Sequence, residues 1–125
     1  MQQVSIINQT HPLPAPLRVK HCRSFAERLR GLMFLAGLPA GSGALIDQGR
    51  DSRIDAAIHM FFVGFDLGIV WMDSRREIVD LRLAKSWRPF YMPAHPARYV
   101  LEIHPERLGE FFIGDCIALE NVPVA

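Results

Sequence analysis

The residues best suited to bind a ligand lie in the segment 85–93. Trp87, Arg88 and Tyr91 place a large aromatic ring, a forked cation and a phenol close together, in a stretch stiffened by two prolines. Such a group can stack on a planar or sugar-like ligand and clamp an anion. We predict a ligand site formed by these residues beside the apolar run that carries His59, with Arg88 contacting the ligand and Trp87 anchoring the loop.

A structural role explains the composition of the same segment equally well. In this interpretation Trp87 and Phe90 fold back over an open end of the hydrophobic core, and Arg88 pairs with Glu102 or Asp66. Long loops in compact domains tend to be functional or disordered. The sequence leaves the binding and the structural interpretation of this loop open.

Acid–base catalysis is a second chemistry that the side chains allow. His59 can work with Asp66 or Glu102 as an acid–base pair. The simpler interpretation of His59 is a half-buried histidine that hydrogen-bonds to backbone or to a carboxylate. The chain has no Gly-x-Ser-x-Gly turn and no glycine-rich phosphate loop before a helix, so we favour binding over catalysis.

A metal site would need three or four ligands from distant positions to converge. No two candidates have the close spacing of a zinc motif, so we predict no metal and no cofactor. The candidate ligands are His59, Asp66, His95, Glu102, His104 and Cys116.

Length and composition indicate one ordinary globular domain. The chain has 125 residues, of which 50% are hydrophobic and 22% are charged, and this length can bury a core without metal or disulfide bonds. The formal net charge of +1 does not indicate a strongly basic face for nucleic acid. We expect a loose arm at 1–15 and a single domain at 16–125, as a monomer or homodimer with a small molecule or a protein as partner.

Cysteine number and the first residues suggest a compartment. Cys22 and Cys116 are too few for a disulfide framework, and we expect both to be reduced. The chain starts without the basic and apolar regions of a signal peptide, and it has no apolar run as long as a membrane span. We therefore expect a cytoplasmic protein that does not associate with membranes.

One amphipathic helix is predicted at 24–34. Ser24 and Glu27 have the spacing of a capping box, in which each side chain satisfies a backbone N–H of the first turn. Gly31 lies inside the helical pattern, where glycine costs about 1 kcal/mol relative to alanine, so we expect close approach to a strand there. The apolar stripe of this helix consists of Phe25, Leu29, Leu32 and Met33.

The rest of the chain is predicted to be mainly β-structure. Apolar and polar residues alternate in several short runs that are separated by turn residues. We expect a hairpin from 67–72 and 77–83, a polar loop at 48–53 and a helical turn at 105–111. The other predicted strands are 4–7 at a sheet edge, 17–21, 44–46, 56–62, 99–104 and 116–120.

Six short motifs follow one another along the chain. In this order they resemble the motifs of the domain of unknown function 192 (DUF192) family, over about Leu17 to Glu120. The resemblance implies a mainly β, jelly-roll-like domain with no established activity. The motifs are Arg30–Met33, Gly43–Ile46, Ile58–Val63, Trp87–Arg88, Val100–Glu102 and Gly114–Asp115.

Two positions depart from the family pattern. Met60 stands where a threonine or asparagine is usual. Gly68 stands where an aspartate is usual, and Asp66 lies two residues earlier. If the usual aspartate serves a shared site, this chain has lost or moved it.

These observations predict an antiparallel β-sandwich or jelly-roll-like small barrel with one N-terminal helix. The predicted function is a non-enzymatic binding module for a small polar or sugar-like ligand or a protein partner. The alternative is an enzyme on a small polar or carbohydrate-like substrate that uses His59 with Asp66 or Glu102. One cleft lined by His59, one of these carboxylates and Arg88 would favour the enzyme.

Overall fold

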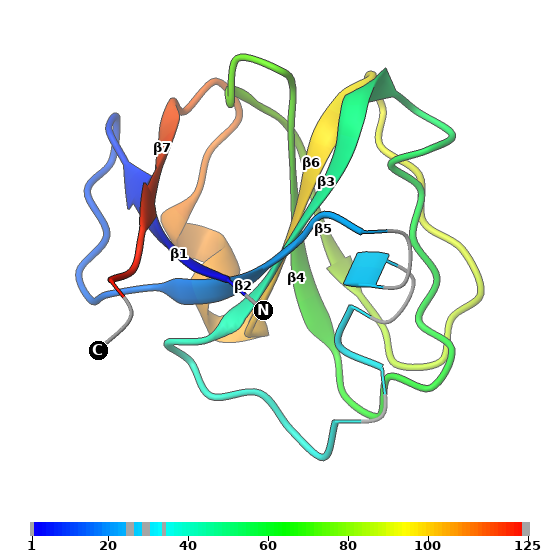
Figure 1. Cartoon of the computed structure of the whole chain (residues 1–125). Helices are drawn as coiled ribbons and strands as arrows, with labels where there is room; N and C mark the ends of the chain where they lie inside the picture. The colour runs from blue at the N-terminus through cyan, green and yellow to red at the C-terminus, as the bar shows by residue number, and fades with distance from the viewer. Residues whose placement is uncertain (1, 25–26, 29–30, 34, 124–125) are drawn as a thin grey trace.

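Within the residues that the structure describes, seven strands form one curled β-sheet (Figure 1). The structure is a computed structural model, and it describes residues 2–24, 27–28, 31–33 and 35–123. The elements are β1 (Gln3–Asn8), β2 (Arg18–Cys22), β3 (Gly43–Ser52), β4 (Leu67–Met72), β5 (Ile78–Ala84), β6 (Ala97–Ile103), the 3₁₀ helix η1 (Pro105–Glu110) and β7 (Ile117–Asn121).

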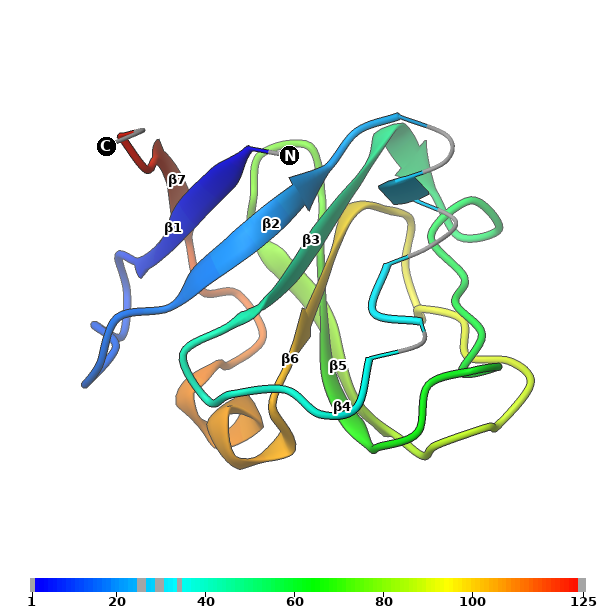
Figure 2. The same cartoon turned by 60° about the horizontal axis from the view of Figure 1, so that its bottom comes forward.

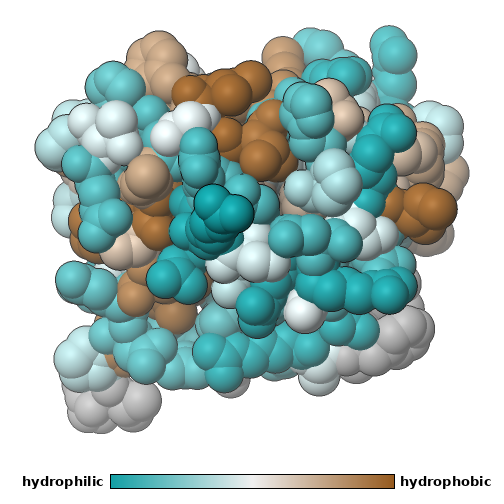
Figure 3. All heavy atoms as spheres, turned by 90° about the horizontal axis from the view of Figure 1, so that it is seen from above, coloured by the Kyte–Doolittle hydropathy of each residue, from teal (hydrophilic) through white to brown (hydrophobic). Residues whose placement is uncertain are grey.

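The strand order across the sheet is β5-β4-β6-β3-β2-β1-β7. All neighbours are antiparallel except β2 and β3, which run parallel with Lys20 opposite Ala44 and Cys22 opposite Ile46. The sheet curls into a half-barrel, as Figures 1 and 2 show from two directions. Figure 3 shows the molecule from above relative to Figure 1. The surface on this side is mainly hydrophilic, with separate hydrophobic patches.

The curl brings the first residues of β5 and β7, at opposite ends of the sheet order, next to each other. The N–H of Ile78 donates to the carbonyl of Asp115 at 2.9 Å, and the N–H of Gly114 donates to the carbonyl of Ile78 at 2.8 Å. The N–H of Ile117 donates to the carbonyl of Arg76 at 2.9 Å. These bonds tie the half-barrel together at one end.

The Gly114–Asp115 motif stabilises this junction between β5 and β7. The carboxylate of Asp115 is buried and accepts hydrogen bonds from the Asn8 amide at 2.9 Å and the Phe112 N–H at 3.0 Å, and it pairs with His11 at 2.8 Å. Burial raises the pKa of Asp115, but these bonds outweigh it and hold the pKa below its usual value. The motif therefore fastens the end of β1 to the start of β7.

The mainly β prediction is confirmed, whereas an antiparallel sandwich or jelly roll is not. The described strands lie in a single sheet, and the β2–β3 pair is parallel. Parallel neighbours need a crossover of a dozen residues or more, and the connection 23–42 is long enough to supply one. The prediction missed this pair because it considered strand composition and not the length of the connection.

The predicted helix at 24–34 lies partly outside the described residues, which exclude 25–26, 29–30 and 34. The capping box is present: the Glu27 N–H donates to the Ser24 hydroxyl, and the Ser24 N–H donates to the Glu27 carboxylate, both at 3.1 Å. Glu27 and Arg28 are helical, but residues 31–33 form turns and Gly31 has a φ of 46°. The helix therefore does not run through 31–33, because a left-handed glycine ends an α-helix.

Among the strand predictions, the 67–83 hairpin is confirmed as β4 and β5. β3 continues to Ser52, so the polar loop predicted at 48–53 is mostly strand. The run 56–62 is not a strand; Ile58 makes one isolated bridge, to Tyr91. The expected edge strand at 4–7 is β1, which pairs with β2 and β7 on its two sides and so is not at an edge.

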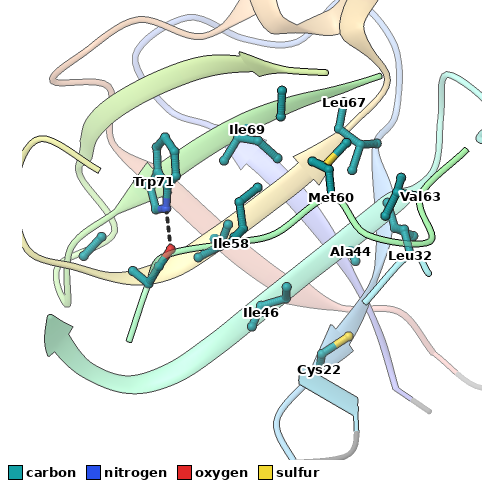
Figure 4. Close-up of a cluster of buried hydrophobic side chains, with 14 residues drawn as sticks. Cys22, Leu32, Ala44, Ile46, Ile58, Met60, Val63, Leu67, Ile69 and Trp71 are labelled. Carbon is teal, nitrogen blue, oxygen red and sulfur yellow. Dashed lines mark hydrogen bonds between the residues drawn. The ribbon is translucent and has the colours of Figure 1, made fainter. Parts of the chain in front are cut away.

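The described core residues form two clusters, one on each face of the sheet. The inner cluster, on the concave face, includes Val4, Leu45 and Leu101 and lies against Leu108 of η1, which packs on β4 and β5. The outer cluster is drawn in Figure 4, where the Trp71 indole N–H donates to the carbonyl of Ala56 at 2.9 Å. Leu32, Met60 and Val63 belong to the outer cluster, so the segments 31–33 and 56–63 cover this face.

We predict that Leu32→Ala lowers the free energy of unfolding by roughly 2–5 kcal/mol, because Leu32 is only 3% exposed within the outer cluster. Leu35→Ala is the matched control: Leu35 is 39% exposed, and its truncation should change stability by less than about 0.5 kcal/mol. Urea unfolding of both variants measures the difference. Equal stability of the two variants would mean that Leu32 does not pack on the sheet.

Candidate functional site

A cleft of about 390 Å³ opens on the outer face of the sheet. Its floor is formed by β3 and β6, and its walls by the β2–β3 crossover and the segment 53–66. The lining residues are Arg28, Gly31, Leu32, Met33, Ile46, Gln48, Asp55, Ala57, Ile58, His59, Val63 and Glu102. The cleft therefore has apolar walls with a few polar groups, which is typical of a small-molecule site.

Glu102 on β6 is the most unusual of these groups. Its side chain is only 5% exposed, and no donor in the described part of the chain makes a hydrogen bond to its carboxyl group. Burial raises the pKa of Glu102 to about 7, an effect that the charge of Lys20 partly offsets. Near neutral pH, Glu102 is a mixture of the protonated acid and the carboxylate at the base of an open cleft.

Gly31 and Lys20 bring the crossover close to Glu102. The Lys20 ammonium donates to the carbonyl of Gly31. A Cβ atom at Gly31 would lie only 3.0 Å from Oε1 of Glu102, and the positive φ of Gly31 also favours glycine. The expectation of close approach between Gly31 and a strand is thus confirmed, and the strand is β6.

Cys22 lies under the crossover, in the same outer cluster (Figure 4). Its side chain is fully buried, and burial raises the pKa of its thiol to about 11, an effect that the charge of Lys20 partly offsets and the charge of Glu102 reinforces. A thiol with so high a pKa is a poor nucleophile at neutral pH. Cys22 is therefore a packing residue beside the cleft.

His59 stands on the wall formed by residues 53–66. Its Nδ1 accepts a hydrogen bond from the N–H of Phe61 at 3.2 Å. In the neutral ring the proton is therefore on Nε2, so His59 can offer an N–H donor at the cleft. Asp55, also on this wall, pairs with Arg50 at 2.8 Å.

The structure brings together two of the predicted site residues, His59 and Glu102, and places the others elsewhere. Trp87, Arg88 and Tyr91 do not line the cleft. Trp87 is 53% exposed and Arg88 is also exposed, while the Tyr91 hydroxyl accepts from the Lys85 N–H at 2.8 Å. Arg88 pairs with neither Glu102 nor Asp66 among the described contacts.

Asp66 has a local structural role. Its carboxylate accepts from the Ser86 N–H at 2.9 Å and from the Lys85 ammonium at 3.3 Å. Gly68 faces η1, where a Cβ atom would lie 3.2 Å from Ile103 and Leu108. An aspartate at position 68 would crowd that packing, and it would lie on the face opposite the cleft.

Sequence reasoning did not select Arg28, Gln48 or Asp55 for the site, because they are polar residues without distinctive spacing. A signal for Glu102 was present: it is a charge within the otherwise apolar run Tyr99–Ile103 of β6, on the same face as Val100. Gly31 was noted only for packing. Among the described residues, no group of three histidine, cysteine or acidic side chains is arranged to hold a metal ion.

The chain belongs to the DUF192 family. The family profile, described as an uncharacterized ACR, matches residues 6–118. The chain is 36% identical over 97 residues to a UPF0127 protein of Thermococcus kodakarensis, which covers 78% of this chain and 60% of that protein. It is 30% identical over 104 residues to a UPF0127 protein of Pyrococcus furiosus, and this match covers 78% of this chain and 80% of that protein. The chain thus spans about 60% of the length of the Thermococcus relatives that it matches.

Two solved structures share the fold. A Sinorhizobium meliloti protein, described as a candidate transcription regulator, has a TM-score of 0.79 and 22% identity, over 94% of this chain and 92% of that chain. A Novosphingobium aromaticivorans protein of unknown function has a TM-score of 0.77 and 23% identity, over 93% and 83%. At these identities the likeness concerns the fold. No helix in the described part of the chain is long and apolar enough to cross a membrane.

Four of the six motifs that resemble the family border the cleft. The cleft residues that these motifs contribute are Gly31, Leu32, Met33, Ile46, Ile58, His59, Val63 and Glu102. These segments come from distant parts of the chain, and the fold brings them to one place. The Trp87–Arg88 and Gly114–Asp115 motifs lie outside the cleft.

The raised pKa of Glu102 predicts a pH-dependent stability. Between about pH 4.5 and pH 7 the unfolded chain loses the Glu102 proton while the folded protein keeps it, so this residue makes stability fall as pH rises through that window. Glu102→Gln should remove the effect, gaining up to about 3 kcal/mol relative to the wild type across the window. Urea unfolding at several pH values tests this.

Glu120→Gln is the control for that comparison, because it makes the same substitution at an exposed glutamate on β7. Its stability should follow the wild type at each pH. Parallel pH profiles for wild type and Glu102→Gln would mean that the Glu102 carboxyl is hydrated or paired in the folded protein.

The two cysteines, both free in the structure, should differ in reactivity. Cys116 is exposed, so a disulfide reagent should titrate one thiol rapidly in the native protein. Cys22 should react only after unfolding, because it is buried and its thiol pKa is raised. Two rapid thiols would mean that the crossover does not shield Cys22, and no free thiol in the unfolded, unreduced protein would indicate a disulfide.

Proposed function

We propose that the protein is a non-enzymatic binding module that takes a small polar ligand into the cleft over Glu102. The observation that carries the proposal is the buried carboxyl group of Glu102, which has no hydrogen-bond donor among the described residues and opens into a cleft. Burial disfavours the charged form of this group and raises its pKa to about 7. A ligand that donates a hydrogen bond to Glu102 would offset this effect of burial, so the proposed ligand has hydroxyl, amide or amine donors.

The walls of the cleft support the same ligand class. Leu32, Ile46 and Ile58 provide apolar contact for a carbon skeleton, and His59 provides an N–H donor at one side. Arg28 at the cleft can pair with an acidic group of the ligand. This pattern fits a compact, hydroxylated or zwitterionic molecule with one apolar face.

One observation favours the alternative of an enzyme. Glu102 has a pKa of about 7 and shares the cleft with His59, whose imidazole can serve as an acid–base partner for the carboxyl group. Arg88 and Asp66, the other residues of the catalytic hypothesis, lie outside the cleft. The two functions differ in outcome: a bound compound is recovered unchanged from a binding module and is converted by an enzyme, which NMR of the compound after incubation distinguishes.

A thermal-shift screen of small hydroxylated, amide and amine compounds tests the binding function, because a ligand of the native state raises the melting temperature. The dissociation constant of each hit is then measured by calorimetry for wild type, Glu102→Gln and Ala57→Phe. We expect at least about tenfold weaker binding in both variants, because the first loses a carboxylate acceptor and the second fills the cleft.

Glu120→Gln should bind each hit as tightly as the wild type. Circular dichroism and melting curves first establish that Ala57→Phe is folded. Hits that keep their affinity in both cleft variants bind elsewhere and contradict the proposal. A screen in which none of the three compound classes stabilises the wild type contradicts it as well.

A further inference from the structure

Four aromatic side chains are exposed on two neighbouring loops beside the cleft. Phe61 and Phe62 are 43% and 48% exposed, and Trp87 and Phe90 are 53% and 59% exposed. None of them lines the cleft. We call these four residues, together with Arg88, the aromatic surface. Large apolar side chains gathered in this way on a folded protein mark interaction sites.

The two loops are held together by a short backbone ladder. Ile58 and Tyr91 exchange two hydrogen bonds of 2.8 and 2.9 Å, the Met60 N–H donates to Arg88 at 2.9 Å, and the Trp87 N–H donates to Met60 at 3.0 Å. The Ser86 hydroxyl adds a bond of 2.6 Å to the carbonyl of Val63. Ile58 and Met60 belong to this ladder, and their side chains are buried in the core. The two loops therefore form a fixed platform.

Two of these aromatic residues have a left-handed backbone conformation. Phe62 and Trp87 have φ values of 61° and 63°, a region that bulky residues rarely adopt. Their rings meet edge to face, with centroids 5.2 Å apart and planes at 62°. Conformations of this kind cost about 1–3 kcal/mol each and occur chiefly at functional sites.

The charges around the platform are mainly positive. The cations in or beside these loops are Arg53, which donates to the carbonyl of Pro93, and Arg82, Lys85 and Arg88. The neighbouring carboxylates are Asp66, which pairs with Lys85, and Asp80, which accepts from the N–H of Ala94. The Arg82 guanidinium lies over the Tyr91 ring at 6.0 Å. Among the described residues, no carboxylate is within ion-pair distance of the exposed Arg88. Arg88 is thus available to an anion.

We propose that the aromatic surface docks an acidic segment of a partner protein that carries aromatic or branched apolar side chains. Tryptophan, phenylalanine and arginine are enriched at the centres of protein interfaces, and the local positive charge complements an acidic partner. The platform is pre-organised, which reduces the entropy lost on binding. Single-stranded nucleic acid fits less well, because the edge-to-face rings offer no continuous stack and the chain has a net charge of only +1.

A random-peptide display library panned against the full chain tests this inference. Wild type should enrich peptides that combine aspartate or glutamate with aromatic or branched apolar residues. Arg88→Glu should reverse the charge of the enriched peptides from acidic to basic. Trp87→Asn should weaken synthetic copies of the wild-type peptides at least about tenfold, and asparagine tolerates the left-handed backbone at this position.

Ile54→Ser is the control, because Ile54 is 78% exposed and lies outside the aromatic surface; it should bind the wild-type peptides unchanged. Melting curves establish that each variant is folded, and because Arg88 is exposed its variant should melt like the wild type. The inference is overturned if wild type enriches no such peptides or if all variants select the same ones. It is equally overturned if a labelled oligothymidine binds tightly and loses affinity in the Trp87 variant while the peptides do not.

Discussion

The parallel pairing of β2 with β3 is the constraint on which the rest of this structure depends. A chain that leaves β2 must return to the other end of the sheet before it can run alongside in the same direction, so residues 23–42 are required to cross a sheet face. The crossover buries Leu32 and Cys22 in the outer cluster and brings Gly31 against Glu102. The segment 53–66 covers the neighbouring part of the same face. The cleft is the space that these two coverings leave open.

Within that cleft, the position of Glu102 sets the chemistry. Strand alternation on β6 turns Val100 and Glu102 toward the outer face of the sheet. Val100 packs in the outer cluster, whereas the carboxyl group of Glu102 has no hydrogen-bond donor among the described residues. The sheet holds this carboxyl group in an apolar setting, and Lys20 lowers its pKa only in part. A ligand at the cleft and a partner at the aromatic surface would occupy adjacent places, since Phe61 lies 5.5 Å from the cleft residue His59, ring to ring.

Local pattern was enough to predict most strands, because alternation and turn residues act over short distances. The β4–β5 hairpin and the Ser24–Glu27 capping box follow from such signals. The parallel pair, the interior position of β1 and the half-barrel depend on long-range pairing, which residue spacing does not encode. The same holds for the site: His59 and Glu102 were selected for their chemistry, whereas Arg28 and Asp55 join them only through the crossover and the 53–66 segment. The run 56–62 has strand composition, but it pairs with residues 87–91 in a short ladder outside the main sheet.

The central claim is that the Glu102 carboxyl group is buried, unpaired and open to a ligand at the base of the cleft. The most direct measurement is a carbon-13 NMR titration of the glutamate side-chain carboxyl groups, with the Glu102 resonance assigned by its absence from Glu102→Gln. This account predicts a midpoint near pH 7 for Glu102. A midpoint at the ordinary glutamate value of about 4.3 would show a hydrated or ion-paired carboxylate, and it would contradict the account of the site.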